Sequence, residues 1–193
     1  LGKTSDRRLR LGAAIRLGNE RERDPAPEDA YTYRAAATAR FRVHETLTIG
    51  AGIGVVSRLE RDPALLVFPV AQWRLSDRTR LELGPTPSLT TYRASLSHEL
   101  GDEWVLGAYA GVEYHQFRLE DDNPAAANGI LTDLVVPVGV FVTYVPLPGL
   151  ELRGEVGTWA NRRQELRSSD GGLFEDLELQ QGVTLSARVS FSF

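Results

Sequence analysis

A glutamate and a histidine stand two positions apart in the stretch Glu113-Tyr114-His115, and side chains of these types at this spacing could take part in catalysis. Residues two apart on an extended strand share a face, so the carboxylate and the imidazole would be neighbours. Such a pair can serve as an oriented general base, provided that a nucleophile or second carboxylate converges on it. The residues that could converge are Ser57, Glu60 and Asp62. The alternative, which we favour, is a histidine held in a polar network.

The residue patterns that thiol, metal and phosphate-binding chemistry would need are absent from the sequence. The chain has no cysteine, so it offers neither a disulfide nor a thiolate ligand or nucleophile. The acidic run at 120–123 could attract a divalent cation, but it lacks the spacing of a calcium-binding loop and is interpreted as a solvated loop. Neither a phosphate-binding glycine loop nor a zinc spacing is present, so we expect no metal, no cofactor and no enzyme activity.

The elements that would position these side chains are strands. Apolar and polar residues alternate with period two, as in Arg8–Gly18, where Leu9, Leu11 and Ile15 share one face. The same alternation recurs often enough to predict about ten strands, with 8 to 12 as the range. The segments are 8–18, 30–44, 46–59, 65–75, 79–85, 89–98, 104–117, 134–145, 150–161 and 177–193.

The connections between these segments alternate in length. Short connections alternate along the chain with mostly longer ones. The short ones lie at 44–45, 76–78, 100–103 and 147–149, and the others lie at 19–30, 60–64, 84–87, 119–129 and 161–176. Every second connection then lies at the same end of the sheet, as an up-and-down meander requires. Pro69 and Pro137 fall inside strands, where each needs a bulge or an unpaired position, and Pro85 and Pro87 cut the fifth segment short.

Glycines indicate which face lies inside. Nearly all strand glycines share the face that carries arginine, threonine and serine, with Gly154 as the exception on the apolar face. On a water-facing strand glycine only adds backbone entropy cost, whereas inside a narrow barrel it makes room for long side chains that reach in from the opposite wall. We therefore expect the polar face to line the interior and the apolar face to meet lipid.

Aromatic residues on the apolar face gather near the segment ends, in two belts like those that flank the hydrocarbon core of a bilayer. Trp159 is an exception, because its parity turns it inward. The expected belt residues are Tyr31, Tyr33, Phe41, Trp73, Trp104, Tyr114, Tyr144, Phe191 and Phe193.

Two stretches carry a resemblance. The chain ends in TLSARVSFSF, and its alternating Val189, Phe191 and Phe193 resemble the C-terminal signal by which bacterial outer-membrane barrels are recognised for assembly. The stretch DPALLVFPVAQWRLSDRTRLELG, continuing to about residue 118, is similar to a family of uncharacterised outer-membrane barrels. This resemblance implies fold and compartment and no activity. The last strand would pair back to the first.

With faces assigned, the interior is predicted to be cationic although the chain as a whole carries a net charge of −4. Buried arginine keeps its proton, so each guanidinium needs a carboxylate, a carbonyl, water or a bound anion beside it. The expected charge network comprises Arg10, Arg16, Arg34, Arg40, Arg42, Arg58, Arg74, Arg80, Glu82, Arg93, Glu113, Arg153, Glu155 and Arg188, and the same parity turns Arg163 inward.

The sequence therefore predicts one all-β domain over residues 1–193: a transmembrane antiparallel barrel in a bacterial outer membrane, with both termini periplasmic. Residues 1–7 would be a periplasmic lead-in, left after removal of a signal peptide. The expected partners are lipid, the barrel assembly machinery and other envelope proteins, and not nucleic acid. The favoured function is a structural or interaction component with a lumen mostly filled by side chains. The alternatives are a narrow anion-favouring pore and a hydrolase with a rim site around Glu113 and His115.

Overall fold

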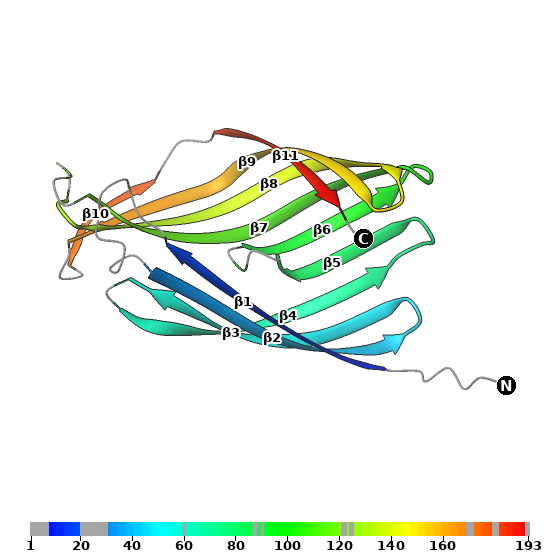
Figure 1. The fold of residues 1–193 in the computed structure, drawn as a ribbon, viewed down its shortest axis with the longest axis horizontal. Helices are drawn as coiled ribbons and strands as arrows, with labels where there is room; N and C mark the ends of the chain where they lie inside the picture. Colours follow the sequence, from blue (N-terminus) through cyan, green and yellow to red (C-terminus); the bar gives the residue numbers. More distant parts are fainter. Residues whose placement is uncertain are drawn as a thin grey trace.

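Every element in the residues that the structure describes is a β-strand, and these strands form one antiparallel sheet that meanders along the chain (Figure 1). The structure is a computed structural model and describes residues 8–19, 31–59, 61–86, 89, 91–120, 123, 126–168, 172–178 and 182–191. None of these residues belongs to a helix that is long and apolar enough to cross a membrane.

The strands follow the predicted order. They are β1 Leu9–Asn19, β2 Tyr31–His44, β3 Leu47–Arg58, β4 Arg61–Arg74, β5 Thr79–Pro85, β6 Thr91–Glu99, β7 Trp104–Arg118, β8 Ile130–Leu147, β9 Leu150–Arg167, β10 Leu173–Glu178 and β11 Val183–Phe191.

The first nine strands match the predicted segments, and the tenth segment is divided. Its first part belongs to β10, which pairs with residues 163–167 of β9, and the rest forms β11, which pairs with residues 150–158 of the same strand. Strands β8 and β9 are each 18 residues long, several residues longer than predicted at the end away from their tight turn. The alternation of apolar and polar residues identifies the strands, but it becomes less regular at the ends of β8 and β9 that extend past the apolar band.

The last strand does not pair back to the first, so that expectation is wrong for the described residues. The ladders run from β1 to β10, with β11 beside β9, and no ladder joins β1 to β11. The sheet is open, with two free edges. Alternation fixes the face that each residue occupies, but it carries no information on which strand lies next to an edge.

The two faces of the sheet differ in the way the alternation predicts. Large apolar side chains stand on the exposed face, with Leu11 77% and Ile53 56% exposed. On the opposite face Arg34 is only 4% exposed. That face is concave, because side chains of β6 and β9 meet across the two strands between them. The apolar residues thus point outward and the polar residues line the hollow of the curled sheet.

Pro69 and Pro137, the two prolines expected inside strands, lie where the ladders are interrupted or shifted. At Pro137 the register shifts, since Val136 faces Asn161 while Pro137 faces Trp159, so Ala160 bulges out of β9. At Pro69 the neighbouring ladder is missing: β4 pairs with β5 only through Ala71–Arg74. Both prolines therefore avoid a position where a backbone N–H would be needed.

Candidate functional site

The centre of the concave face holds a network of two arginines and one glutamate. Arg93 of β6 donates to Glu155 of β9, with Nη1 3.3 Å from Oε1, and the Nε of Arg153 donates to the same oxygen at 2.7 Å. The three side chains are only about a fifth exposed. One carboxylate therefore serves two guanidinium groups, which leaves a net positive charge.

Aromatic rings supply the rest of the support for these cations. The Arg93 guanidinium lies 3.5 Å from the centroid of the Tyr109 ring, and the Arg153 guanidinium lies 3.7 Å from that of the buried Phe141. A cation over a ring face is attracted by the negative centre of the ring, more strongly when water is excluded. The rings thereby compensate for part of the missing negative charge.

Glycines on neighbouring strands make room for the rings. Gly107 pairs with Phe141, and Gly139 pairs with Tyr109; a Cβ on either glycine would overlap the ring opposite. The glycines do lie on the polar face, as predicted. The side chains they accommodate are rings on the adjacent strand, whereas we expected long side chains reaching from the far wall.

A cavity of about 420 Å³ adjoins this network. Its charged lining residues come from β2, β5, β6, β9 and β11, and four of them are cationic and two anionic. These residues are Arg40, Glu82, Arg93, Arg153, Glu155 and Arg188. The interior is therefore not completely filled by side chains, and the open volume has a cationic wall.

Arginines also face each other across the ladders. Arg10 is the cross-strand partner of Arg40, and Arg16 that of Arg34. The same holds for Arg74 with Arg80 and for Arg153 with Arg188. Like charges directly opposite destabilise a sheet unless something of opposite charge lies between or beside them. These four pairs concentrate positively charged side chains on one face of the sheet.

The other predicted charges spread over this face. Arg58 and Glu113 are half-buried, while Arg42 is exposed and Arg80 approaches Glu99 at 4.0 Å near the tight-turn end. Gln72 donates to Glu82 at 2.8 Å. The structure thus brings Arg93, Arg153 and Glu155 into direct contact with one another, and it places the other predicted charges elsewhere on this face.

Glu113 and His115 do lie side by side, with the His115 Nε2 3.8 Å from a carboxylate oxygen of Glu113. The group that converges on them is the hydroxyl of Thr91, which donates to Glu113 at 2.8 Å. The carboxylate therefore sits between the hydroxyl and the imidazole, so His115 is not placed to take the Thr91 proton. Within the described ranges, no three of His, Asp and Glu gather as a metal site.

An ion pair that the sequence analysis missed joins β8 and β9. Arg162 makes two hydrogen bonds to Asp133, at 3.0 and 2.7 Å, and its guanidinium lies over the Trp159 ring. The bulge at Ala160 reverses the parity of β9, so Arg162 turns inward and Arg163, predicted inward, has a side chain 50% exposed. Pro137 opposite was the only sequence signal of this reversal.

Most predicted belt aromatics stand on the outer face. Tyr31, Phe41 and Trp73 are exposed, and Trp104 stacks on Tyr144 with ring centroids 4.4 Å apart near the tight-turn end. Tyr33 and Phe191 are exposed as well, whereas Tyr114 is half-buried beside a pocket. Val189 is exposed, and Phe193 lies outside the described residues.

Comparison with known proteins leaves the function to be argued from this geometry: no protein-family model, no curated protein and no solved structure matches the chain.

Proposed function

We propose that this protein is an integral component of a bacterial outer membrane, with a structural or interaction role and a cationic interior. The observation that carries the proposal is the distribution of apolar side chains. Leu11, Ile15 and Leu185 are each more than three-quarters exposed, at 77%, 78% and 80%, and further exposed apolar residues continue around the convex face. An apolar surface this extended marks contact with lipid or protein.

Strand lengths and aromatics support the same proposal. A bilayer needs strands of roughly 9–11 residues, and among the strands of the described residues only β5 and β10 are shorter, with 7 and 6 residues. The stacked Trp104 and Tyr144 lie by the tight turns, where an aromatic belt would meet the membrane surface. In this proposal the tight turns and both ends face the periplasm, and Val189, Phe191 and Phe193 present the last strand to the assembly machinery.

The free edges of β1 and β11 bear on the interaction role. Hydrocarbon offers no water to the edge N–H and C=O groups, so a bilayer would require both edges to be covered. Since the chain has no native cysteine, paired cysteines can report what covers them. In the open sheet Ala13→Cys on β1 is expected to form no intramolecular disulfide with Leu185→Cys, Ala187→Cys or Val189→Cys on β11, and formation of one would show that the two edges cover each other in membranes. Crosslinks between chains would instead identify a partner at the edge.

Quenching by lipid tests the membrane location. We expect a fluorescent label on Leu185→Cys to be quenched by lipids brominated in their acyl chains, and a label on the adjacent Ser186→Cys to be unaffected. Both positions are exposed in the structure and differ only in the face they occupy. Equal quenching at both, or a chain that remains soluble without detergent, would contradict the proposal. Crosslinking in native membranes would then identify the envelope partner.

The cationic cavity favours a second candidate function, a narrow path for anions. Its charged walls and the facing arginine pairs would concentrate anions, and rings of arginine are a known means of anion selectivity. Planar-bilayer recordings test this: we expect an anion preference that is reduced when Arg40 and Arg188 are both changed to Glu. Absence of conductance at all voltages would exclude it. A catalytic role is not proposed, and His115→Ala is expected to leave any ester hydrolysis at background.

A further inference from the structure

The wall of the sheet is incomplete beside the first half of β4. In the described part of the chain, residues 61–70 of this strand pair with β3 alone, because the ladder to β5 starts at Ala71. The next strand surface on that side belongs to β6 and β7. We call the space between Ala64, Leu66, Val67 and Phe68 of β4 on one side and Thr91, Tyr92, Val112 and Tyr114 on the other the slot.

The sequence of β4 explains why no strand fills the slot. Arg74 donates its N–H to Thr46 on the β3 side, so residues of even number turn their backbone groups to β3 and those of odd number turn them to the slot. Pro69 is odd and has no N–H to offer to a neighbouring strand, while Pro63 lies at the register shift between β3 and β4, where the alternation is interrupted. The Pro69 carbonyl is instead bonded by the Tyr92 hydroxyl, 2.6 Å away across the slot.

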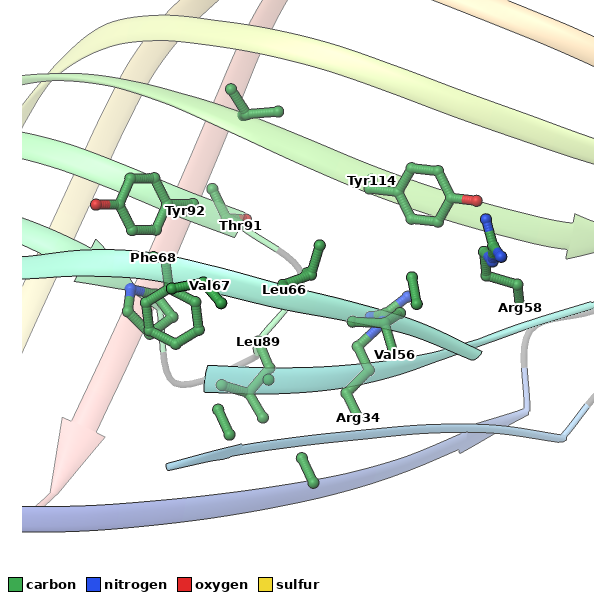
Figure 2. Close-up of a pocket in the computed structure, with 16 residues that line it drawn as sticks. Arg34, Val56, Arg58, Leu66, Val67, Phe68, Leu89, Thr91, Tyr92 and Tyr114 are labelled. Carbon is green, nitrogen blue, oxygen red and sulfur yellow. The ribbon is translucent and has the colours of Figure 1, made fainter. Parts of the chain in front are cut away.

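One end of the slot is apolar. The pocket that it forms has a volume of about 410 Å³, and Leu66, Phe68 and Leu89 lie together in it with Tyr92 (Figure 2). Leu66 belongs to the concave face, since it pairs with Gly54, yet it is 47% exposed. An apolar side chain on the inner face would be expected to be covered, so the slot leaves apolar surface open that a ligand could bury.

The other end of the slot is cationic. Arg34 and Arg58 both line it, and the Tyr114 hydroxyl points toward the Arg58 guanidinium (Figure 2). Arg34 is buried, and the Nε of Arg58 is fixed by the Asp62 carbonyl at 2.8 Å. Two held guanidinium groups beside a phenol form a suitable environment for a carboxylate.

We propose that the slot binds a long-chain fatty acid, with the hydrocarbon chain along Leu66 and Phe68 and the carboxylate at Arg34 and Arg58. The separation of an apolar end from a cationic end matches a single-chain anionic amphiphile. A volume near the lower limit for ligand pockets suits one chain rather than a two-chain lipid. This site goes beyond the proposed function; only entry of the ligand from the bilayer rests on it, because binding can be measured in detergent.

Displacement of a fluorescent fatty acid tests the site. Purified protein in a nonionic detergent is titrated with cis-parinaric acid, and palmitate is then added as competitor. We expect saturable binding and displacement, with hexadecanol, which has the same chain without the charge, competing about tenfold more weakly for lack of a charge-assisted hydrogen bond. Failure of palmitate to displace the probe overturns the proposal, and equal competition by hexadecanol overturns the role of the arginines.

Two variants on one strand provide the matched control. Leu66→Trp fills the slot and should weaken palmitate binding about tenfold or more, whereas Leu65→Trp lies on the outer face of β4 and should change it less than about twofold. Arg58→Gln should weaken palmitate and leave hexadecanol unchanged. Retained strand content by circular dichroism shows that each variant is folded, and equal effects at 65 and 66 overturn the site.

Mass spectrometry of the co-purified lipid distinguishes the source of the ligand. We expect free fatty acid bound to the unaltered protein and depleted in Leu66→Trp. Retention of a phospholipid in its place would overturn the assignment to a free acid. Neither result bears on membrane location, which lipid quenching tests separately.

Discussion

The wall formed by β7, β8 and β9 and the wall formed by β4, β5 and β6 are built from the same alternation, yet they differ in how completely they close. We call them the long wall and the short wall. In the long wall β8 pairs with β9 from Ile130 to Leu147. In the short wall β4 and β5 share four residue pairs, from Ala71–Leu83 to Arg74–Arg80.

The long wall also carries most of the tightly packed side chains. Phe141 fills the space over Gly107, Asp133 binds Arg162, and a small apolar cluster of Leu119, Ala126 and Leu166 lies near the long-loop end. The short wall has a slot instead. Proline placement contributes to the difference, since Pro69 offers no N–H to a ladder with β5 whereas the ladder at Pro137 continues through a bulge. The long wall is therefore continuous and closely packed, and the short wall is open beside the first half of β4.

Adding one methyl group should reveal the difference most strongly. A Cβ on Gly107 would overlap the Phe141 ring and the Leu96 carbonyl, whereas one on Gly84 would make an ordinary contact with Val70. Because overpacking costs about 1–3 kcal/mol, we expect Gly107→Ala to lower the free energy of unfolding by about 3 kcal/mol and Gly84→Ala by less than about 1 kcal/mol. Urea titration in detergent measures both, and equal losses would contradict the contrast.

Removing a charge from the long wall should also lower the free energy of unfolding more than removing one from the short wall, but by a smaller amount than the added methyl group does. Asp133→Asn weakens a two-bond ion pair in which the side chains are 10% and 25% exposed, so we expect a loss of about 2 kcal/mol. Glu99→Gln acts on a pair 4.0 Å apart with both side chains about half exposed, and should change stability by less than about 0.5 kcal/mol. The urea midpoints of the two variants measure the stability that each has lost. A larger loss of stability in the Glu99 variant would contradict the prediction.

The weakest expected effect concerns the bond across the slot. Tyr92→Phe removes the hydroxyl that bonds the Pro69 carbonyl and should cost about 1 kcal/mol. Hydrogen exchange should rise in β4 and remain unchanged in β8, since the bond crosses only the short wall. Tyr144→Phe is the control, because its ring stacks on Trp104 away from the slot. Increased exchange in both strands would mean that the walls are coupled.

Alternation alone was sufficient to predict the first nine strands and the faces of most of their residues. It placed Leu11 outside and Arg34 inside, because a period of two assigns the face whatever the neighbouring strand is. It also placed Glu113 beside His115, since both lie on one strand. These predictions needed only local geometry.

Contacts between strands could not be predicted in the same way. The network of Arg93, Arg153 and Glu155 joins strands that are three apart in the sheet, and nothing in the spacing of these residues specifies that curvature. Arg163 was wrongly turned inward because one bulged residue reverses parity beyond it. The slot was signalled only indirectly, by Pro69 and by the prolines that shorten the fifth segment.

The four-pair ladder between β4 and β5 has a mechanical consequence. A sheet bends most easily along the line crossed by the fewest hydrogen bonds, and here that line separates β1–β4 from β5–β11. A small rotation about it moves each half as a stiff plate and changes the spacing between the two outermost strands. A force that bends the sheet would therefore act mainly at the β4–β5 ladder, with the rest of the sheet keeping its curvature.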